Sequence, residues 1–142
     1  MRMLRPVLLL FLFWVAGCTP TAQDESRLYR ELGGQEGITA IVDGFLYELA
    51  SDHDVLPLFA NTDIDRFREK FIEQLCDVTG GPCDYSGDTM QETHREMQIT
   101  RAQFNSVVED LMRAMTREGV PVGTQNRLLR RLAVMYDEIV YL

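Results

Sequence analysis

Histidine is scarce in this chain: only His53 and His94 occur among its 142 residues. Glu92 and Glu96 lie near His94, but no second histidine accompanies them. The chain also lacks a Ser-His-Asp arrangement, a P-loop and a dinucleotide-binding fingerprint, so the common motifs of hydrolases and nucleotide-binding proteins are absent.

Basic residues are also few. Lysine and arginine number 14 against 22 aspartates and glutamates, which gives a formal net charge of −8. Nucleic-acid binding depends on lysine and arginine to neutralise phosphates, and a polybasic membrane-surface segment depends on the same residues. The charge balance therefore argues against nucleic acid as a partner and against a polybasic mode of membrane attachment.

Long apolar runs are missing as well. The N-terminal run, residues 7–16, has about ten residues, whereas a membrane-spanning helix needs roughly 20. It follows Arg2 and Arg5, and a basic start before a short apolar run is typical of a secretory signal. The run ends in Val15-Ala16-Gly17-Cys18, where small residues precede a cysteine as in a bacterial lipobox. We therefore predict lipidation of Cys18; the alternatives are an ordinary cleaved signal peptide and an uncleaved anchor.

The expected organisation is a lipoprotein signal peptide at residues 1–17, a polar tether at 18–24 and one domain at 25–142. The last segment has the length of a single domain. These boundaries predict an exported protein that a lipid on Cys18 anchors to a membrane of the cell envelope, on the periplasmic face or at the cell surface.

Of the three cysteines, Cys76 and Cys83 remain once Cys18 is lipidated. They flank a short turn, and export would place them in an oxidising compartment, where disulfides persist. A bridge between them would stabilise the fold by roughly 2–2.5 kcal/mol on the chain-entropy model. The alternative is a pair of free, unrelated thiols. A redox-active pair is disfavoured, because the spacing is not Cys-x-x-Cys.

Alternating strand patterns and internal repeats are absent, so the remaining helical periodicity predicts an all-α domain. The segment 61–63 and Thr100 supply helix N-caps, and the pairs Gly33-Gly34 and Gly80-Gly81 mark helix ends or tight bends. The expected helices cover residues 26–32, 36–50, 64–78, 101–118 and 124–141, with a brief turn at 55–59 and one or two turns at 90–95.

Apolar residues in these helices recur at the spacing of one helix face, so we expect them to face inward. They are Ile38, Ile41, Val42, Phe45, Leu46, Leu49, Ile64, Phe67, Phe71, Ile72, Leu75, Phe104, Val107, Val108, Leu111, Met115, Leu128, Leu132, Met135 and Ile139.

His94 lies in a run, residues 79–100, in which a helix ends at paired glycines, an irregular loop follows, and a brief helical turn carries the imidazole. This run resembles the proximal haem segment of the truncated haemoglobins of group 1. That family places a Gly-Gly turn and a Tyr-[Thr/Ser]-Gly loop before its iron-binding histidine. The resemblance extends over residues 28–140. Residues 28–34 match the opening Leu-Tyr-x-x-Leu-Gly-Gly, and residues 42–45 match an aromatic-bearing segment.

The resemblance implies a truncated globin fold, which is a two-over-two helix sandwich around one haem b. It implies that His94 is the iron ligand on the proximal side. The haem contacts that it implies are Phe59, Met90 and Phe104 against the porphyrin, and Leu46, Phe67 and Phe71 on the distal side.

The distal side departs from the best-known pattern of the family, a tyrosine in the second helix and a glutamine in the fourth. Leu46 and Phe71 stand at those positions, and Phe67 lies one turn earlier. Tyr47 is adjacent, but its periodicity points it away from the haem. Without a side-chain donor we expect roughly 10- to 100-fold faster release of dioxygen, because a charge-assisted hydrogen bond contributes about 1.5–3 kcal/mol.

Lys70 precedes Phe71 and has three interpretations: a solvated lysine, a salt bridge to a haem propionate, or a sixth iron ligand with a depressed pKa. His53 lies in a polar loop, so we expect it to be exposed and not to bind a metal.

The predicted function is reversible binding of dioxygen or another diatomic gas by a haem globin, with nitric oxide or peroxide chemistry and a reductase partner as further expectations. One alternative is a haem protein used for electron transfer or sensing. The other alternative is a haem-free helical lipoprotein that serves as an interaction module.

Overall fold

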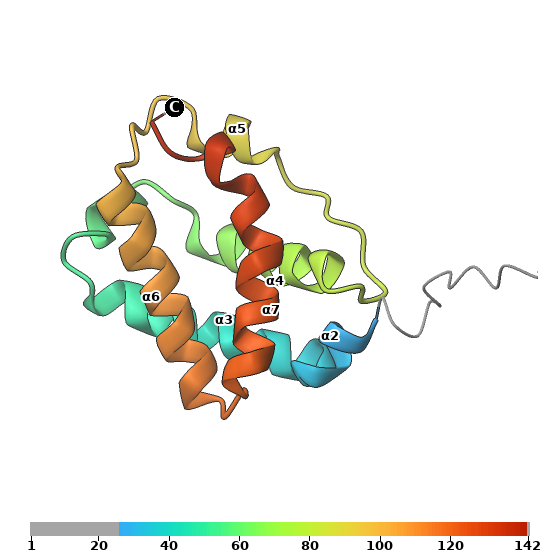
Figure 1. Cartoon of the computed structure of the whole chain (residues 1–142). Coiled ribbons are helices and arrows are strands. Elements are labelled where there is room, and N and C mark those ends of the chain that lie inside the picture. Colours follow the sequence, from blue (N-terminus) through green and yellow to red (C-terminus); the bar gives the residue numbers. More distant parts are fainter. Residues whose placement is uncertain (1–25, 142) are drawn as a thin grey trace, which may run out of the picture.

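The computed structural model describes residues 26–141 (Figure 1). The predicted signal peptide at 1–17, the tether at 18–24 and the lipidated Cys18 lie outside the described residues. Within residues 26–141, no helix is both long enough and apolar enough to cross a membrane.

The prediction of an all-α fold is confirmed. α3 packs against both α4 and α6, and α7 packs against α2 and α6. Figure 1 shows α6 and α7 crossing in front of α3 and α4, which makes a sandwich of two helix pairs. The elements are α2 (Arg27–Glu31), α3 (Gly34–Ser51), the 3-10 helix η1 (Leu56–Phe59), α4 (Ile64–Val78), α5 (Met90–His94), α6 (Arg101–Arg117), α7 (Val122–Leu132) and the 3-10 helix η2 (Ala133–Glu138).

The paired glycines end and begin helices as expected. Gly33 has φ of 90°, a left-handed conformation that favours glycine, and its carbonyl accepts a hydrogen bond from the Gly37 amide. α3 therefore begins two residues earlier than predicted. α4 has its predicted bounds, with the Asp63 carboxylate accepting from the Arg66 amide at 3.1 Å. Gly80, with φ of 78°, follows its C-terminus.

Reciprocal caps begin both α5, which ends in His94, and α6, which follows it. The Thr89 hydroxyl accepts from the Glu92 amide, and the Glu92 carboxylate accepts from the Thr89 amide. Thr100 and Gln103 make the same exchange at the start of α6, which confirms the predicted cap. Each exchange satisfies two amides that a helix N-terminus leaves unpaired, so both boundaries are set by local sequence.

The prediction of one last helix over 124–141 is wrong. α7 ends at Leu132, and the chain continues as a 3-10 helix to Glu138. Beyond it, Val140 forms a parallel bridge with Ile99, and the Tyr141 amide donates to the Ile99 carbonyl at 3.0 Å. A continuous α-helix would keep these backbone groups paired within itself. The long-range pairing with Ile99 therefore overrides the local helical periodicity.

Most residues expected to face inward are buried or half-buried. Ile64 is the exception: its side chain is 43% exposed, because it opens α4 within a segment, residues 60–66, that is exposed throughout. The half-buried members lie mainly around the candidate site described below. The fully buried members are Ile38, Ile41, Val42, Phe45, Leu49, Ile72, Leu75, Leu111, Met115 and Leu128.

The core also holds a carboxyl group that the sequence pattern does not reveal. Asp110 of α6 is 0% exposed, and its Oδ2 has no hydrogen-bond partner among the described residues. Arg113 donates to Asp110 Oδ1 and to Glu48 of α3. Burial raises the pKa of Asp110, although Arg113 opposes the shift. The charged form of Asp110 is thus costly in the folded protein.

Asp110→Asn should remove a pH-dependent cost to stability. Because burial raises the pKa of Asp110 above its usual 3.8, the folded protein binds this proton more tightly than the unfolded chain does. The contribution of this group is therefore present at low pH and is lost as pH rises through the folded pKa. The variant's free energy of unfolding, relative to wild type, should increase between about pH 4 and about pH 7 in urea titrations. Glu118→Gln, an exposed change at the C-cap of the same helix, is the control. An equal difference at both pH values would contradict the expectation.

Candidate functional site

His94 is the last residue of α5, a five-residue helix. Its Nδ1 lies 2.8 Å from the carbonyl oxygen of Met90. A carbonyl only accepts hydrogen bonds, so Nδ1 carries the proton and Nε2 keeps its lone pair. The side chain is half-buried, and this burial lowers the pKa of the imidazole below its usual 6.5. His94 is therefore neutral near pH 7, with one nitrogen able to bind a metal.

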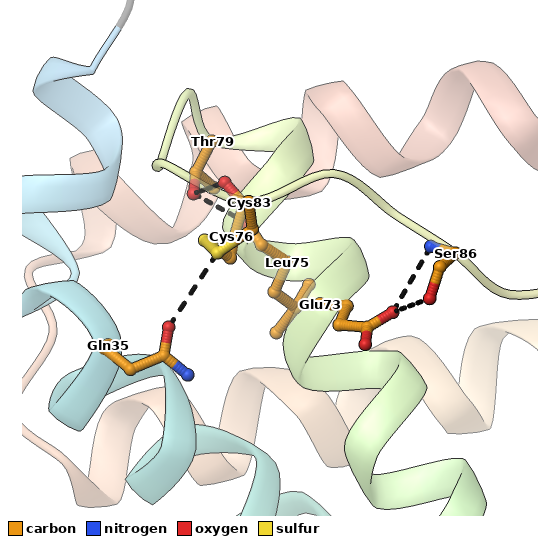
Figure 2. Close-up of a disulfide and its surroundings, with 7 residues drawn as sticks. All are labelled: Gln35, Glu73, Leu75, Cys76, Thr79, Cys83 and Ser86. Atoms are coloured by element: carbon orange, nitrogen blue, oxygen red, sulfur yellow. Dashed lines mark hydrogen bonds between the residues drawn. A yellow bond between two sulfur atoms is a disulfide. The ribbon is translucent and has the colours of Figure 1, made fainter.

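The loop that joins α4 to α5, residues 82–89 and here called the strap, is bonded covalently to α4. Cys76 near the end of α4 forms a disulfide with Cys83, with their Cα atoms 5.9 Å apart (Figure 2). The predicted bridge is confirmed, and the alternative of two free thiols is wrong. Packing is close here: a Cβ on Gly81 would lie 2.6 Å from the Cys76 sulfur and from the Tyr29 ring. The disulfide thus holds the first residues of the strap against the C-terminal part of α4.

Polar contacts fasten the strap further along. The Glu73 carboxylate accepts from the Ser86 amide at 3.2 Å and from the Ser86 hydroxyl at 2.9 Å (Figure 2). Lys70 Nζ donates to Glu73 and to Ser86 Oγ, both at 2.9 Å. These hydrogen bonds lower the pKa of Glu73 and raise that of Lys70. Both groups therefore remain charged.

The contacts follow one face of α4. Arg66 lies 3.8 Å from Asp88 and adds a weaker ion pair. The α4 partners at positions 66, 70, 73 and 76 recur every three or four residues, which places them on one helix face. Their partners in the strap occur in the reverse order, so the strap runs antiparallel to α4. The strap thus connects α4 to α5, which carries His94.

A second face of α4 carries the predicted distal residues. The rings of Phe67 and Phe71 stack with centroids 5.7 Å apart. Phe71 lies 5.2 Å from the Phe45 ring, and Phe67 meets Phe59 edge-on at 5.3 Å. Leu46 packs against the same core. The structure thus gathers the predicted apolar residues of α3, η1 and α4, and none of them carries a side-chain hydrogen-bond donor.

Tyr47 points away from this cluster, as its periodicity predicts. Its side chain is 63% exposed, and the guanidinium of Arg117 lies 4.8 Å above its ring. Tyr47 therefore supplies no hydroxyl to the distal cluster in this structure.

On the α5 side, Met90 and Phe104 each contact a residue that was not predicted for the site. These residues are Gln74 and Tyr136. Phe104 meets the ring of Tyr136 edge-on at 4.9 Å. The buried amide of Gln74 donates to the sulfurs of Met90 and Met135 at 3.3 and 3.5 Å. Gln74 follows Phe71 by three residues, and this spacing indicates that both lie on one face of α4. A glutamine at such a position is ordinarily assigned to solvent, because its buried partners come from distant segments.

Lys70 is not a freely solvated lysine. Its side chain is 20% exposed and bonds to Glu73, Glu69 and Ser86. A sixth iron ligand would need an unprotonated amine, whereas the pKa of Lys70 is raised. The salt bridge to a haem propionate stays a prediction. His53 is exposed, as expected.

The residues present suit a haem better than a bare metal ion. Across residues 26–141, no three histidine, cysteine, aspartate or glutamate side chains gather where they could hold such an ion. Haem iron requires only an axial ligand from the protein, because the porphyrin supplies the equatorial ones. The neutral, half-buried imidazole of His94 meets that requirement.

Known proteins share this architecture. The family model for bacterial-like globins matches residues 27–141. The group 1 truncated haemoglobin of Mycolicibacterium paratuberculosis is 29% identical over 116 residues, which cover 82% of this chain and 85% of that protein. The group 1 truncated haemoglobin of Nostoc sp. (strain MUN 8820) is 30% identical over 115 residues, 81% of this chain and 98% of that protein. The crystal structure of the truncated haemoglobin from Tetrahymena pyriformis in its Fe(III) form aligns with a TM-score of 0.78 at 26% identity, covering 81% of this chain and 98% of that one. The chain therefore belongs to the bacterial-like globin family and, within it, to the group 1 truncated haemoglobins.

Proposed function

We propose that this globin holds one haem b through His94 and reversibly binds a diatomic gas, dioxygen first, on the opposite face of the haem. The single observation that carries the proposal is the hydrogen bond from His94 Nδ1 to the Met90 carbonyl, which leaves Nε2 for the iron. A backbone carbonyl is a usual partner for orienting a metal-binding imidazole. When bound, haem supplies the ferrous iron to which a gas coordinates.

His94→Ala should remove the axial ligand. We expect haem affinity to fall by at least about tenfold, since loss of even an outer-shell partner of a metal ligand costs about 10- to 100-fold. Absorption spectra during haem titration would measure the change, and His53→Ala is the matched control because that histidine is exposed. The proposal fails if wild-type protein leaves the Soret band of added haem neither shifted nor sharpened, which is the outcome that the haem-free alternative requires. Unchanged haem affinity in His94→Ala would also defeat it.

The distal cluster supports transient binding of dioxygen rather than tight scavenging. Leu46, Phe67 and Phe71 have no hydrogen-bond donor in their side chains, and Tyr47 is turned outward. A gas that needs no donor, such as nitric oxide, loses less in such a pocket than dioxygen does. Nitric oxide or peroxide chemistry, supplied with electrons by a reductase, is therefore a secondary activity within the same proposal.

Phe71→Gln should restore a donor on the distal side. We expect dioxygen release to slow by roughly 10- to 100-fold, because a charge-assisted hydrogen bond contributes about 1.5–3 kcal/mol. Stopped-flow displacement of dioxygen by carbon monoxide would measure the rate. Phe71→Leu, which opens similar space without a donor, should not slow release. Equal rates in the two variants would show that the distal side does not limit release.

Export and lipid anchoring belong to the same proposal. They are supported by the basic start, the short apolar run and the small residues before Cys18. The Cys76–Cys83 disulfide is in keeping with an oxidising compartment. On this proposal the globin works at the cell envelope, where gas arrives from outside.

Cys18→Ser should abolish lipid attachment. We expect wild-type protein in the membrane fraction and the variant in the soluble extracytoplasmic fraction or unprocessed. Fractionation with metabolic fatty-acid labelling would measure this, and Cys83→Ser serves as the control for loss of a cysteine elsewhere. Labelling of Cys18→Ser at the wild-type level would refute the lipoprotein assignment.

A further inference from the structure

The Cys76–Cys83 disulfide joins the two sides of the proposed haem site. Cys76 belongs to α4, which carries Phe67 and Phe71, and Cys83 belongs to the strap that leads to His94. We propose that this disulfide is a positioning element for His94, so that its reduction loosens the protein's hold on haem and on the bound gas. The inference rests on the proposed ligation of iron by His94.

Without the disulfide, the strap depends on contacts near the surface. Arg66 and Asp88 are mostly exposed, and ion pairs of this kind contribute little. The bonds between Glu73 and Ser86 fasten the strap at one point only. The strap, residues 82–89, forms no helix or strand of its own, so no regular backbone pairing replaces the covalent link.

Freedom in the strap passes directly to His94. α5 has five residues, and so short a helix is not stable by itself. Its position depends on the strap before it, on η2, against which it packs, and on the contact of Met90 with Gln74 of α4. The Met90 carbonyl that orients the imidazole lies within α5 as well, so any shift of α5 moves the ligand and its hydrogen-bond acceptor together.

The two sulfurs differ in their access to solvent. Cys76 is fully buried, whereas Cys83 is half-buried. The thiolate of an external dithiol therefore attacks the Cys83 sulfur, forming a mixed disulfide and releasing Cys76 as a thiolate, which takes a proton. The second thiol of the reagent then closes its own disulfide and releases Cys83 as a thiol. Two electrons pass from the dithiol to the protein. On this proposal the cysteine pair regulates haem binding and does not itself catalyse a redox reaction.

Thermodynamic linkage makes the effect reciprocal. If haem binds the disulfide form more tightly by some factor, haem must make the disulfide harder to reduce by the same factor. For this two-electron couple, a tenfold preference corresponds to a shift of about 30 mV in the midpoint potential. A purely local disulfide, with no influence on the haem site, would show no such shift.

The experiment uses the full chain carrying Cys18→Ser, so that only Cys76 and Cys83 react. Dithiothreitol buffers set the fraction of reduced protein, and a maleimide gel shift measures it with and without haem. We expect the midpoint potential to be about 30 mV more negative with haem. After the reagent is removed, haem transfer to excess apomyoglobin should be about tenfold faster from the protein with the reduced disulfide, below the upper bound of about sixtyfold set by loop-closure entropy. The iron–imidazole Raman band of the ferrous protein should also shift when the disulfide is reduced.

Two variants separate positioning from general stability. Cys76→Ala/Cys83→Ala should resemble the reduced protein and ignore dithiothreitol. Glu73→Gln keeps the disulfide but weakens the polar contact to Ser86. Reduction of the disulfide should therefore shift the Raman band of this variant more than that of wild type. This comparison remains available if the double variant fails to fold. Equal midpoint potentials and an unchanged Raman band would overturn the inference, even if reduction lowered the melting temperature. If the protein with the intact disulfide left the Soret band of added haem neither shifted nor sharpened, the proposed function would be overturned as well.

Discussion

Attachment of the strap to α4 is the constraint on which the candidate site depends. α4 presents three faces: one buries Ile72 and Leu75 in the core, one carries Phe67 and Phe71, and the third holds the strap. A helix is stiff over 15 residues, so a loop fastened to one face is placed at a set distance from the other two. His94 is thereby held in relation to the distal phenylalanines through a single helix.

The polarity of the site follows from how α4 divides its residues. Lys70 and Glu73 keep their charges because they pair with each other and with Ser86 at the edge of the molecule. The stacked phenylalanines occupy the neighbouring face. Burial lowers the pKa of His94 in α5, which keeps its imidazole neutral. Charge is thus kept on the strap side of α4, and the side where a gas would bind is apolar. An iron held by His94, as proposed, would have a basic ligand on one side and, from Leu46, Phe67 and Phe71, no hydrogen-bond donor on the other.

Local signals predicted most of the fold, and long-range pairing accounts for the errors. The bounds of α4 and the cap at Thr100 were predictable because periodicity and capping act over a few residues. The end of α7 was not, because Val140 leaves the helical path to pair with Ile99. Gln74 and Asp110 were missed for the same reason. Their burial depends on partners from other helices, which a single sequence does not bring together.

By itself, the sequence determined which atoms are available. It contains one histidine in a run that resembles the proximal haem segment of truncated haemoglobins, two cysteines flanking a turn, and apolar residues at positions 46, 67 and 71. The tertiary structure decided their states: the bridge between Cys76 and Cys83, the proton on His94 Nδ1 and the ion pair between Lys70 and Glu73. Residue identity and helical spacing are short-range properties that can be read along the chain. Tautomer, pKa and covalent pairing depend on burial and on groups that meet only when α4, the strap and α5 have packed together.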